Sequence, residues 1–327
     1  MSAPCRQEAL DPQGSATDLA AMFRFAHLSD PHLPLPAVRV RELFSKRVTG
    51  WLSWRYRRRR IHAPDALAAA VADLHRAGPD HIVVTGDIAN ISTAAEFQQA
   101  ATWLGALGRP QDVTLVPGNH DAYVPVSWSA SLGLWGAYMA GDGASPPTSR
   151  DDFPLLRRRG PVAFVGLSTA VPRAPLIATG EVGAAQLARF EAMMRDLTDM
   201  CRVVLIHHPP QIGGASRHKE LSDQRAVREA IARVGADLVL HGHIHRTMLG
   251  RIDSPQGPVP VLGVASTSAH PASKYGAGGY NLIRVERDPA GGWRFDVEVR
   301  SIRADLGGCD TSGRFHLRSP ASRALAA

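Results

Sequence analysis

Short apolar runs separate longer stretches in which apolar residues recur every three or four positions. The runs at 23–28, 81–85 and 113–116 have the length and composition of buried strands. The stretches at 64–78 and 92–108 have the spacing of helices with one apolar face. This alternation predicts an α/β fold in which helices cover strands.

The alternation continues through the middle of the chain and stops near residue 245. Beyond that point only strand-like runs separated by turn signals remain, including a hairpin-type connection at 288–292. We expect one domain, α/β first and mainly β at the end. The other predicted strands are 162–167, 201–206, 237–240, 259–264, 279–285 and 293–300, and the other predicted helices are 183–200 and 223–234.

The two ends of the chain lack this pattern. Residues 1–22 are polar and show no basic stretch followed by an apolar one, so we expect a disordered extension and not a secretory signal. Met22 directly precedes the first predicted strand and is an alternative start. The predicted domain is therefore 23–303, and the weakly patterned residues 304–327 are expected to form a loose tail.

Composition is typical of a folded protein from a reducing compartment. Of 327 residues, 44% are apolar and 20% are charged. No apolar run approaches the roughly 20 residues that a transmembrane helix needs. The three cysteines are widely spaced and form no CxxC motif, so free thiols are expected instead of disulfides. These features predict a cytoplasmic location.

Polar side chains follow five of the predicted strands, at the point where each strand ends. A polar turn or a buried structural histidine explains any one of these clusters alone. Loops at strand ends carry chemistry on a rigid scaffold, however, and five convergent clusters favour one shared site. The clusters are Asp30 and His32; Asp87; Asn119, His120 and Asp121; His207 and His208; and His243 and His245.

These side chains form a mixed set of carboxylate, imidazole and amide ligands. Such donors suit Mn, Fe, Zn or Co, and there are more of them than one tetrahedral ion needs. Two divalent ions about 3.5–4 Å apart account for the excess, since a carboxylate can bridge them. A glycine stands beside the ligands at Gly86, Gly118 and Gly242, where loops must crowd a small volume.

The clusters together resemble the calcineurin-like metallophosphoesterase superfamily. The matching motifs are Asp-x-His, Gly-Asp, Gly-Asn-His-Asp, His-x-Pro and Gly-His-x-His, in that order, within residues 23–285. The resemblance implies a four-layer αββα sandwich with mixed sheets and a dinuclear site at the strand ends. It also implies hydrolysis of a phosphodiester or pyrophosphate bond by a hydroxide that bridges two divalent ions, Mn, Fe or Zn.

The resemblance implies a role for each residue. His207 is preferred to His208 as a ligand because the family pattern is His-x-Pro, and His208 and Asn90 are then expected to contact substrate. His120 corresponds to the family's non-ligand histidine near the leaving group, and Asp121 is expected to orient it. The implied ligands are Asp30, His32 and His245 for the first metal, Asn119, His207 and His243 for the second, and Asp87 as the bridge.

Two related activities and one non-catalytic role remain as alternatives. The superfamily includes the UDP-2,3-diacylglucosamine pyrophosphatases of lipid A synthesis, which typically carry Arg at the position of His120. It also includes cyclic-nucleotide phosphodiesterases, which share the Gly-Asn-His-Asp form. Non-catalytic scaffolds on this fold lose ligands, whereas every ligand position is filled here, so an enzyme is expected.

One segment, 38–61, carries the excess of positive charge. It has nine Lys/Arg and one Glu, a net charge of +8, while the whole chain carries +7. Its apolar residues recur on one helical face. Either this face packs on the sheet, or it binds a partner together with the arginine run. The face consists of Val40, Phe44, Val48, Trp51 and Leu52.

An anionic membrane or a lipid-linked phosphate substrate is the partner expected for segment 38–61. Tryptophans beside the basic run 57–60 are typical of membrane interfaces, and the lipid A pyrophosphatases carry a helical insertion over their site. Nucleic acid is less favoured, because the rest of the chain is −1 overall and offers no second basic strip. A membrane-peripheral location is therefore an alternative to a purely cytoplasmic one.

Overall fold

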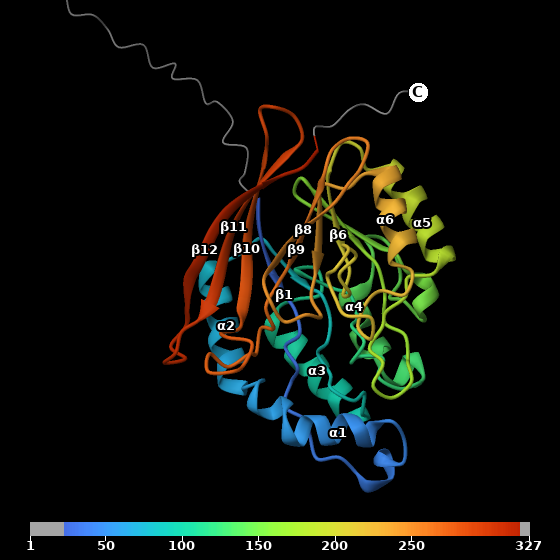
Figure 1. Ribbon diagram of the computed structural model, residues 1–327, viewed down its shortest axis with the longest axis vertical. Helices are drawn as coiled ribbons and strands as arrows, with labels where there is room; N and C mark the ends of the chain where they lie inside the picture. The colour runs from blue at the N-terminus through green and yellow to red at the C-terminus, as the bar shows by residue number, and fades with distance from the viewer. Residues whose placement is uncertain (1–22, 321–327) are drawn as a thin grey trace, which may run out of the picture.

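Two six-stranded sheets form the centre of the protein in a computed structural model that describes residues 23–320 (Figure 1). The first sheet has the order β12-β11-β10-β1-β2-β3, and the second has the order β4-β5-β6-β7-β9-β8. Each sheet contains both parallel and antiparallel pairs. The strands of the first sheet are β1 Phe23–Leu28, β2 His81–Val84, β3 Val113–Leu115, β10 Gly279–Arg287, β11 Trp293–Ile302 and β12 Cys309–Arg318. Those of the second are β4 Leu155–Arg159, β5 Val162–Gly166, β6 Cys201–Leu205, β7 Leu238–His241, β8 Met248–Ile252 and β9 Val259–Gly263.

Helices cover the outer face of each sheet. α2 contacts β10, β11 and β12, and α5 and α6 pack side by side against the second sheet (Figure 1). The inner faces of the sheets share a core in which Phe25 meets Phe164 edge to face, with ring centroids 5.1 Å apart. This is the four-layer αββα sandwich that the sequence predicts. The helices are α1 Arg47–Tyr56, α2 Pro64–Ala77, α3 Ala94–Leu107, α4 Gly136–Met139, α5 Ala184–Arg195 and α6 Gln224–Val234.

Local signals set the ends of the two helices that flank the first strands. α2 begins with Pro64, whose missing N–H is unpaired at a helix start in any case, and it ends at Gly78 in the left-handed region, with φ 58°. α3 begins after Thr93, whose side chain accepts a hydrogen bond from the backbone N–H of Glu96. The carboxylate of Glu96 accepts from the backbone N–H of Thr93 in return, which completes a capping box.

The pattern of apolar residues predicts the elements well. Every strand and helix expected from it is present, with bounds within two residues, except that α5 ends at Arg195 instead of residue 200. The expected loose tail at 304–327 is wrong for residues 309–318, because these form β12 and pair antiparallel with β11. β12 is an edge strand with alternate residues exposed, so few of its side chains are apolar. The expected extension at 1–22 and the end of the tail, 321–327, lie outside the described residues.

The basic segment 38–61 forms a layer of its own below the sheets (Figure 1). It folds as a 3₁₀ turn η1 Val40–Leu43, the helix α1 and a second 3₁₀ turn η2 Arg58–Arg60. Within the described part of the chain, no helix combines the length and apolar character needed to cross a bilayer.

Candidate metal centre

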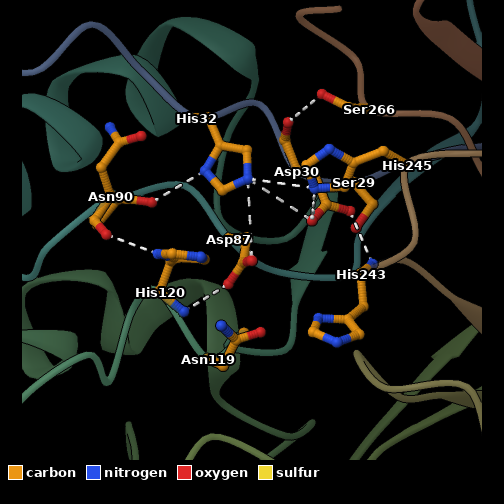
Figure 2. A network of polar contacts seen from close by, with 12 residues as sticks. Ser29, Asp30, His32, Asp87, Asn90, Asn119, His120, His243, His245 and Ser266 are labelled. Carbon is orange, nitrogen blue, oxygen red and sulfur yellow. Dashed lines mark hydrogen bonds and ion pairs between the residues drawn. The ribbon is translucent and has the colours of Figure 1, made fainter. Parts of the chain in front are cut away.

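Parallel strands bring the predicted ligands to one edge of the sandwich. β1, β2 and β3 are parallel, so the residues that follow them, Asp30, Asp87 and Asn119, meet at the same edge of the first sheet. β6 and β7 are parallel in the facing sheet and carry His207 and His243 to the same place. In Figure 2, side chains from both sets point toward one shared space.

Backbone conformations that L-residues rarely adopt are concentrated here. Asp30, His32, Asp87, His243 and His245 all have positive φ, between 36° and 69°, and they are five of the eight non-glycine residues with positive φ in the described chain. Such conformations cost free energy and persist only where the surroundings hold them. The strand ends are therefore shaped for side-chain placement and not for the lowest backbone energy.

Two glycines permit this crowding. A Cβ on Gly118 would lie 2.2 Å from Oδ1 of Asp87, and a Cβ on Gly242 would lie 1.9 Å from Oγ of Ser29. Both distances are far below van der Waals contact, so any side chain at either position would push a ligand loop away. Glycine is thus found at Gly118 and Gly242 because a larger residue would not fit between the loops.

One group of ligand atoms gathers around Asp30. His245 Nε2 lies 3.1 Å from Asp30 Oδ1, and His32 Nε2 lies 3.8 Å from the same oxygen. The two Nε2 atoms of His32 and His245 face each other at 3.4 Å. Ligand atoms about 2.0–2.2 Å from a common ion are separated by similar distances, so these three side chains fit around one cation.

A second group gathers around His207. Its Nε2 lies 3.4 Å from Asp87 Oδ2 and 3.2 Å from Asn119 Oδ1. Ligand atoms of Asp87, His207 and His243 all lie within 4.8 Å of one another. Asp87 Oδ2 is also 3.9 Å from His32 Nε2, in the first group. Asp87 therefore lies between the groups, where a bridging carboxylate would be.

The hydrogen bonds around these ligands leave the inward-facing atoms available. His32 Nδ1 donates to the carbonyl of Ala89 at 3.2 Å, and His207 Nδ1 donates to the carbonyl of Thr85 at 2.5 Å. These bonds occupy both Nδ1 atoms and leave both Nε2 atoms directed into the site. Nε2 of His243 is buried without a hydrogen-bond partner among the described residues. A buried, unpaired nitrogen beside carboxylates fits a metal-binding site.

The carboxylate of Asp87 and the histidines around it shift one another's pKa values. Burial opposes ionisation of Asp87, but the imidazoles of His207 and His120 outweigh burial and hold its pKa well below the usual range. Burial likewise lowers the pKa of His207, yet the Asp87 carboxylate outweighs it and raises that pKa to about 9. The ionised carboxylate of Asp87 thus favours positive charge on the groups around it.

His120 lies beside the ligand groups without belonging to either. Its backbone N–H donates to Asp87 Oδ1 at 2.7 Å, and its ring Nδ1 donates to the carbonyl of Asn90 at 2.6 Å. The ring stacks on Tyr123, with centroids 5.5 Å apart and an interplanar angle of 8°. Burial and then the charge of Arg58 lower the pKa of His120 to about 3, so the imidazole is neutral at neutral pH.

Asp121 has a different role from the one expected. Its carboxylate accepts hydrogen bonds from the backbone N–H groups of Asp87, Ile88, Ala89 and Gly118, at 2.8–2.9 Å. No hydrogen bond links it to the ring of His120 in the described chain. The expectation that Asp121 orients His120 is wrong, and Asp121 instead joins the Asp87 loop to Gly118.

Asn90 and His208 do not face the space between the ligands. The side chain of Asn90 donates to the carbonyl of Leu33 at 2.7 Å, and its contribution to the site is the backbone carbonyl that holds His120. His208 is fully buried, with Nδ1 beside Thr169 Oγ1 at 2.7 Å and Nε2 donating to Ala178 O at 3.1 Å. Both ring nitrogens are occupied, so the expectation that these two side chains contact substrate is not supported.

Two site residues are missed by the sequence motifs. His62 is buried with its ring centroid 4.4 Å from that of His32, and its ligand atom is close to those of His32 and His245. Arg58, from the basic segment, donates from Nη2 to Nε2 of His120 at 2.6 Å. Neither belongs to a strand-end motif. For Arg58 the sequence offers one indication, since segment 38–61 begins directly after the Asp30 loop and can therefore overhang the site. His62 lies just outside this segment.

A pocket of about 810 Å³ opens over the site, and its wall is strongly basic. Asp87 is the one carboxylate that lines it within the described chain. The surplus of positive charge suits an anionic ligand. The basic residues of the wall, apart from histidines, are Lys46, Arg57, Arg58, Arg173, Lys219, Arg246 and Lys274.

Comparison with known sequences and structures finds a partial sequence relative and a solved structure with the same fold. A glycerophosphodiester phosphodiesterase GpdQ of Enterobacter lignolyticus (strain SCF1) is 33% identical over 138 residues, which covers 41% of this chain and 44% of that protein. The chain thus matches less than half of that relative's length. The purple acid phosphatase PPD1 of yellow lupin seeds shares the fold, with a TM-score of 0.54 and 12% identity over 94% of this chain and 57% of that one.

The family profile described as calcineurin-like phosphoesterase matches residues 23–247, more than half of the chain. The matched region contains both ligand groups and the loop that carries His120. It ends before β8, β9, β10, β11 and β12. The chain therefore belongs to the calcineurin-like phosphoesterase family, a family of metal-dependent phosphoester hydrolases.

Proposed function

We propose that this protein hydrolyses a phosphodiester or pyrophosphate bond with the help of two divalent metal ions. The main support for this proposal is the position of Asp87 between two groups of candidate ligand atoms. Its Oδ2 lies 3.9 Å from His32 Nε2 and 3.4 Å from His207 Nε2. Asp30, His32 and His245 would hold the first ion. Asn119, His207 and His243 would hold the second.

Two ions bound there would supply positive charge for the phosphate oxygens and would lower the pKa of the attacking water toward 7. The protein's own residues hold the candidate ligands in position. Asp121 fixes the Asp87 loop through four backbone hydrogen bonds, and Gly118 leaves room for the carboxylate. The strand ends with positive φ hold the candidate ligands close together, which would preorganise the site for ion binding.

His120 and Arg58 would face the leaving side of the bond. The neutral ring of His120 is fixed by Asn90 and Tyr123, and the guanidinium of Arg58 lies 2.6 Å from Nε2 of His120. We propose that Arg58 binds phosphate oxygens of the substrate, since a guanidinium binds such oxygens in a bidentate manner. His120, whose Nε2 accepts from Arg58, then orients the guanidinium, and the N–H groups of Arg58 stabilise the departing oxygen.

A diester is the favoured substrate class, because a relative that is 33% identical over 138 residues is named as a glycerophosphodiester phosphodiesterase. A pyrophosphate is the second candidate. Its support is the basic wall of the pocket, where Lys46, Arg57 and Arg173 stand around the site in addition to Arg58. A substrate with a second anionic group would use these charges, whereas a simple diester would not.

A hydrolysis panel with the Mn²⁺-loaded protein tests this function. We expect turnover of bis-p-nitrophenyl phosphate and glycerophosphoethanolamine, slower turnover of p-nitrophenyl phosphate, and loss of activity in EDTA. Preference for UDP-diacylglucosamine would favour the pyrophosphate class, and preference for cyclic AMP the cyclic-nucleotide class. No turnover of any of these with Mn²⁺, Fe²⁺ or Zn²⁺, together with fewer than one bound ion per chain, would favour a non-catalytic scaffold.

We propose a cytoplasmic location as well. Its support is that Cys201 and Cys309 are buried free thiols, which are typical of a reducing compartment. Cell fractionation with an epitope-tagged chain tests it, and recovery in a periplasmic or culture fraction would contradict it.

A further inference from the structure

The outer face of segment 38–61 carries an apolar stripe that no other residue within 23–320 covers. On α1 the exposed Val48, Leu52 and Tyr56 recur every four residues, and the turn before α1 adds Val40 and Phe44, which are exposed to 73% and 85% of their full accessible area. Of the face that the periodicity predicts, Val40, Phe44, Val48 and Leu52 are exposed and Trp51 is half-buried, so that face as a whole does not pack on the sheet. Half of the large apolar residues exposed in the described chain belong to this stripe. The outer stripe consists of Val40, Phe44, Val48, Leu52 and Tyr56.

Five exposed arginines surround the outer stripe. None of their side chains forms an ion pair or hydrogen bond with a described residue. The single acid of the segment, Glu42, accepts only the backbone N–H of Arg39. No described carboxylate therefore neutralises the charge on this surface. The outer arginines are Arg39, Arg41, Arg55, Arg59 and Arg60.

The opposite face of the same segment is fixed to the protein. Arg47 donates to the carbonyls of Ile91 and Ser92 at 3.1 and 2.7 Å, and Lys46 donates to the carbonyl of Arg173 at 2.8 Å. Gly50 is buried so closely that a Cβ would lie 2.5 Å from Ile91. α1 is therefore held with its pocket side inward and the outer stripe outward, at one end of the molecule (Figure 1).

We propose that this outer face docks on an anionic phospholipid surface. Exposed aliphatic and aromatic side chains flanked by arginines match the boundary between lipid headgroups and acyl chains. A nucleic acid would use the arginines but has no complement for Val40, Phe44 and Leu52. A second copy of this chain would bring two surfaces of the same charge together, which is unfavourable. The proposal is independent of the reaction at the metal centre.

Docking in this way would place the catalytic pocket beside the lipid surface. Lys46, Thr49 and Ser53 of the same segment line that pocket, on the side of α1 away from the outer stripe. One short helix would thus separate the site from the membrane. A phosphate ester at the lipid surface would need to move only a short distance to reach the site.

Vesicle co-sedimentation of the full chain tests the proposal. The probes are vesicles of phosphatidylglycerol and phosphatidylcholine at 1:1, and vesicles of phosphatidylcholine alone. We expect the wild-type protein to bind the anionic vesicles and not the neutral ones. The double variant Arg55→Gln/Arg59→Gln should bind about fivefold more weakly per arginine, and Phe44→Ser/Leu52→Ser at least about tenfold more weakly.

Matched controls keep the result specific. Leu249→Ser removes an exposed apolar side chain on β8, and Arg225→Gln removes an exposed arginine on α6. Both should bind like wild type. All four variants should hydrolyse bis-p-nitrophenyl phosphate at the wild-type rate, since none alters the pocket.

Three results would overturn the proposal. One is equal binding by the stripe variant and the Leu249→Ser control. Another is binding to single-stranded RNA with no binding to anionic vesicles. The third is a wild-type dimer in sedimentation velocity that Phe44→Ser/Leu52→Ser converts to a monomer.

Discussion

Nη2 of Arg58 lies 2.6 Å from Nε2 of His120, so the basic segment reaches into the candidate metal centre. The two residues are 62 positions apart in the chain. Since His120 Nδ1 already donates to Asn90, its Nε2 is the acceptor for Arg58. The contact places a fixed positive charge beside the ring that faces the leaving group in our proposal.

Removal of Arg58 should impair substrate binding and turnover together. We expect Arg58→Ala to lower kcat/KM for bis-p-nitrophenyl phosphate by about 100-fold, which corresponds to about 2.7 kcal/mol. Arg58→Lys should recover only part of this, because an ammonium lacks the bidentate geometry. Steady-state kinetics with equal metal content measures the effect. Arg59→Ala is the matched control, since Arg59 points away from the pocket, and equal losses in both would contradict the role of Arg58.

His120 should matter for turnover but not for metal retention. We expect His120→Ala to bind as many metal ions as wild type, because the ring of His120 belongs to neither ligand group. Its kcat should fall by about 10²–10³-fold, the range for loss of one positioned donor to the departing oxygen, because Arg58 is then no longer oriented. Metal analysis and kinetics on the same sample measure both. Wild-type turnover in this variant would exclude the assignment.

Substitution of the neighbouring histidines should have different effects. The variant at His207 should lose metal, and the variant at His208 should lose stability. His207→Ala removes a ligand atom 3.4 Å from Asp87 and should lose at least one metal ion per chain. His208→Ala leaves the ligands intact but breaks the contacts with Thr169 and Ala178 in a buried position. We expect it to keep its metal and to lose about 2 kcal/mol of unfolding free energy. Plasma emission analysis and urea unfolding distinguish the two, and metal loss from the His208 variant would reverse the assignment.

Asp121 should stabilise the site through the backbone. Asp121→Ala leaves four buried N–H groups without their acceptor, and we expect a loss of at least about 3 kcal/mol in unfolding free energy. Because the Asp87 loop is then released, metal affinity should fall as well. Urea unfolding and metal titration measure the two effects. A variant with lower kcat but unchanged stability and metal affinity would instead support the original idea that Asp121 acts on His120.

The edge strand β12 should be required for stability. A chain that ends after Gly308 lacks β12. It exposes the backbone edge of β11 and the core residues that Phe315 and Leu317 cover. We expect its melting temperature to fall by at least about 5 °C, and thermal unfolding followed by circular dichroism measures this. An unchanged melting temperature would mean that these residues add nothing to the fold.

Sequence by itself determined the main elements of the scaffold and the candidate ligand set. Buried parallel strands need continuous apolar runs, and the helices that cover them need one apolar face, so the pattern predicts β1, β2, β3 and the two helices that flank them almost to the residue. The metal ligands follow those strands directly. Parallel strands end at the same edge of a sheet, so local position in the chain already brings Asp30, Asp87 and Asn119 together.

Tertiary structure alone decided the features that depend on distant contacts. β12 has exposed alternate residues at a sheet edge, so its apolar signal is weak. The direction of Asp121 depends on which unpaired backbone N–H groups surround it. The place of Arg58 depends on how segment 38–61 folds over the pocket, 62 residues from His120. The outward turn of Phe44 follows from the same packing. Periodicity shows that a segment has two faces, whereas only packing against the rest of the chain determines which face is covered.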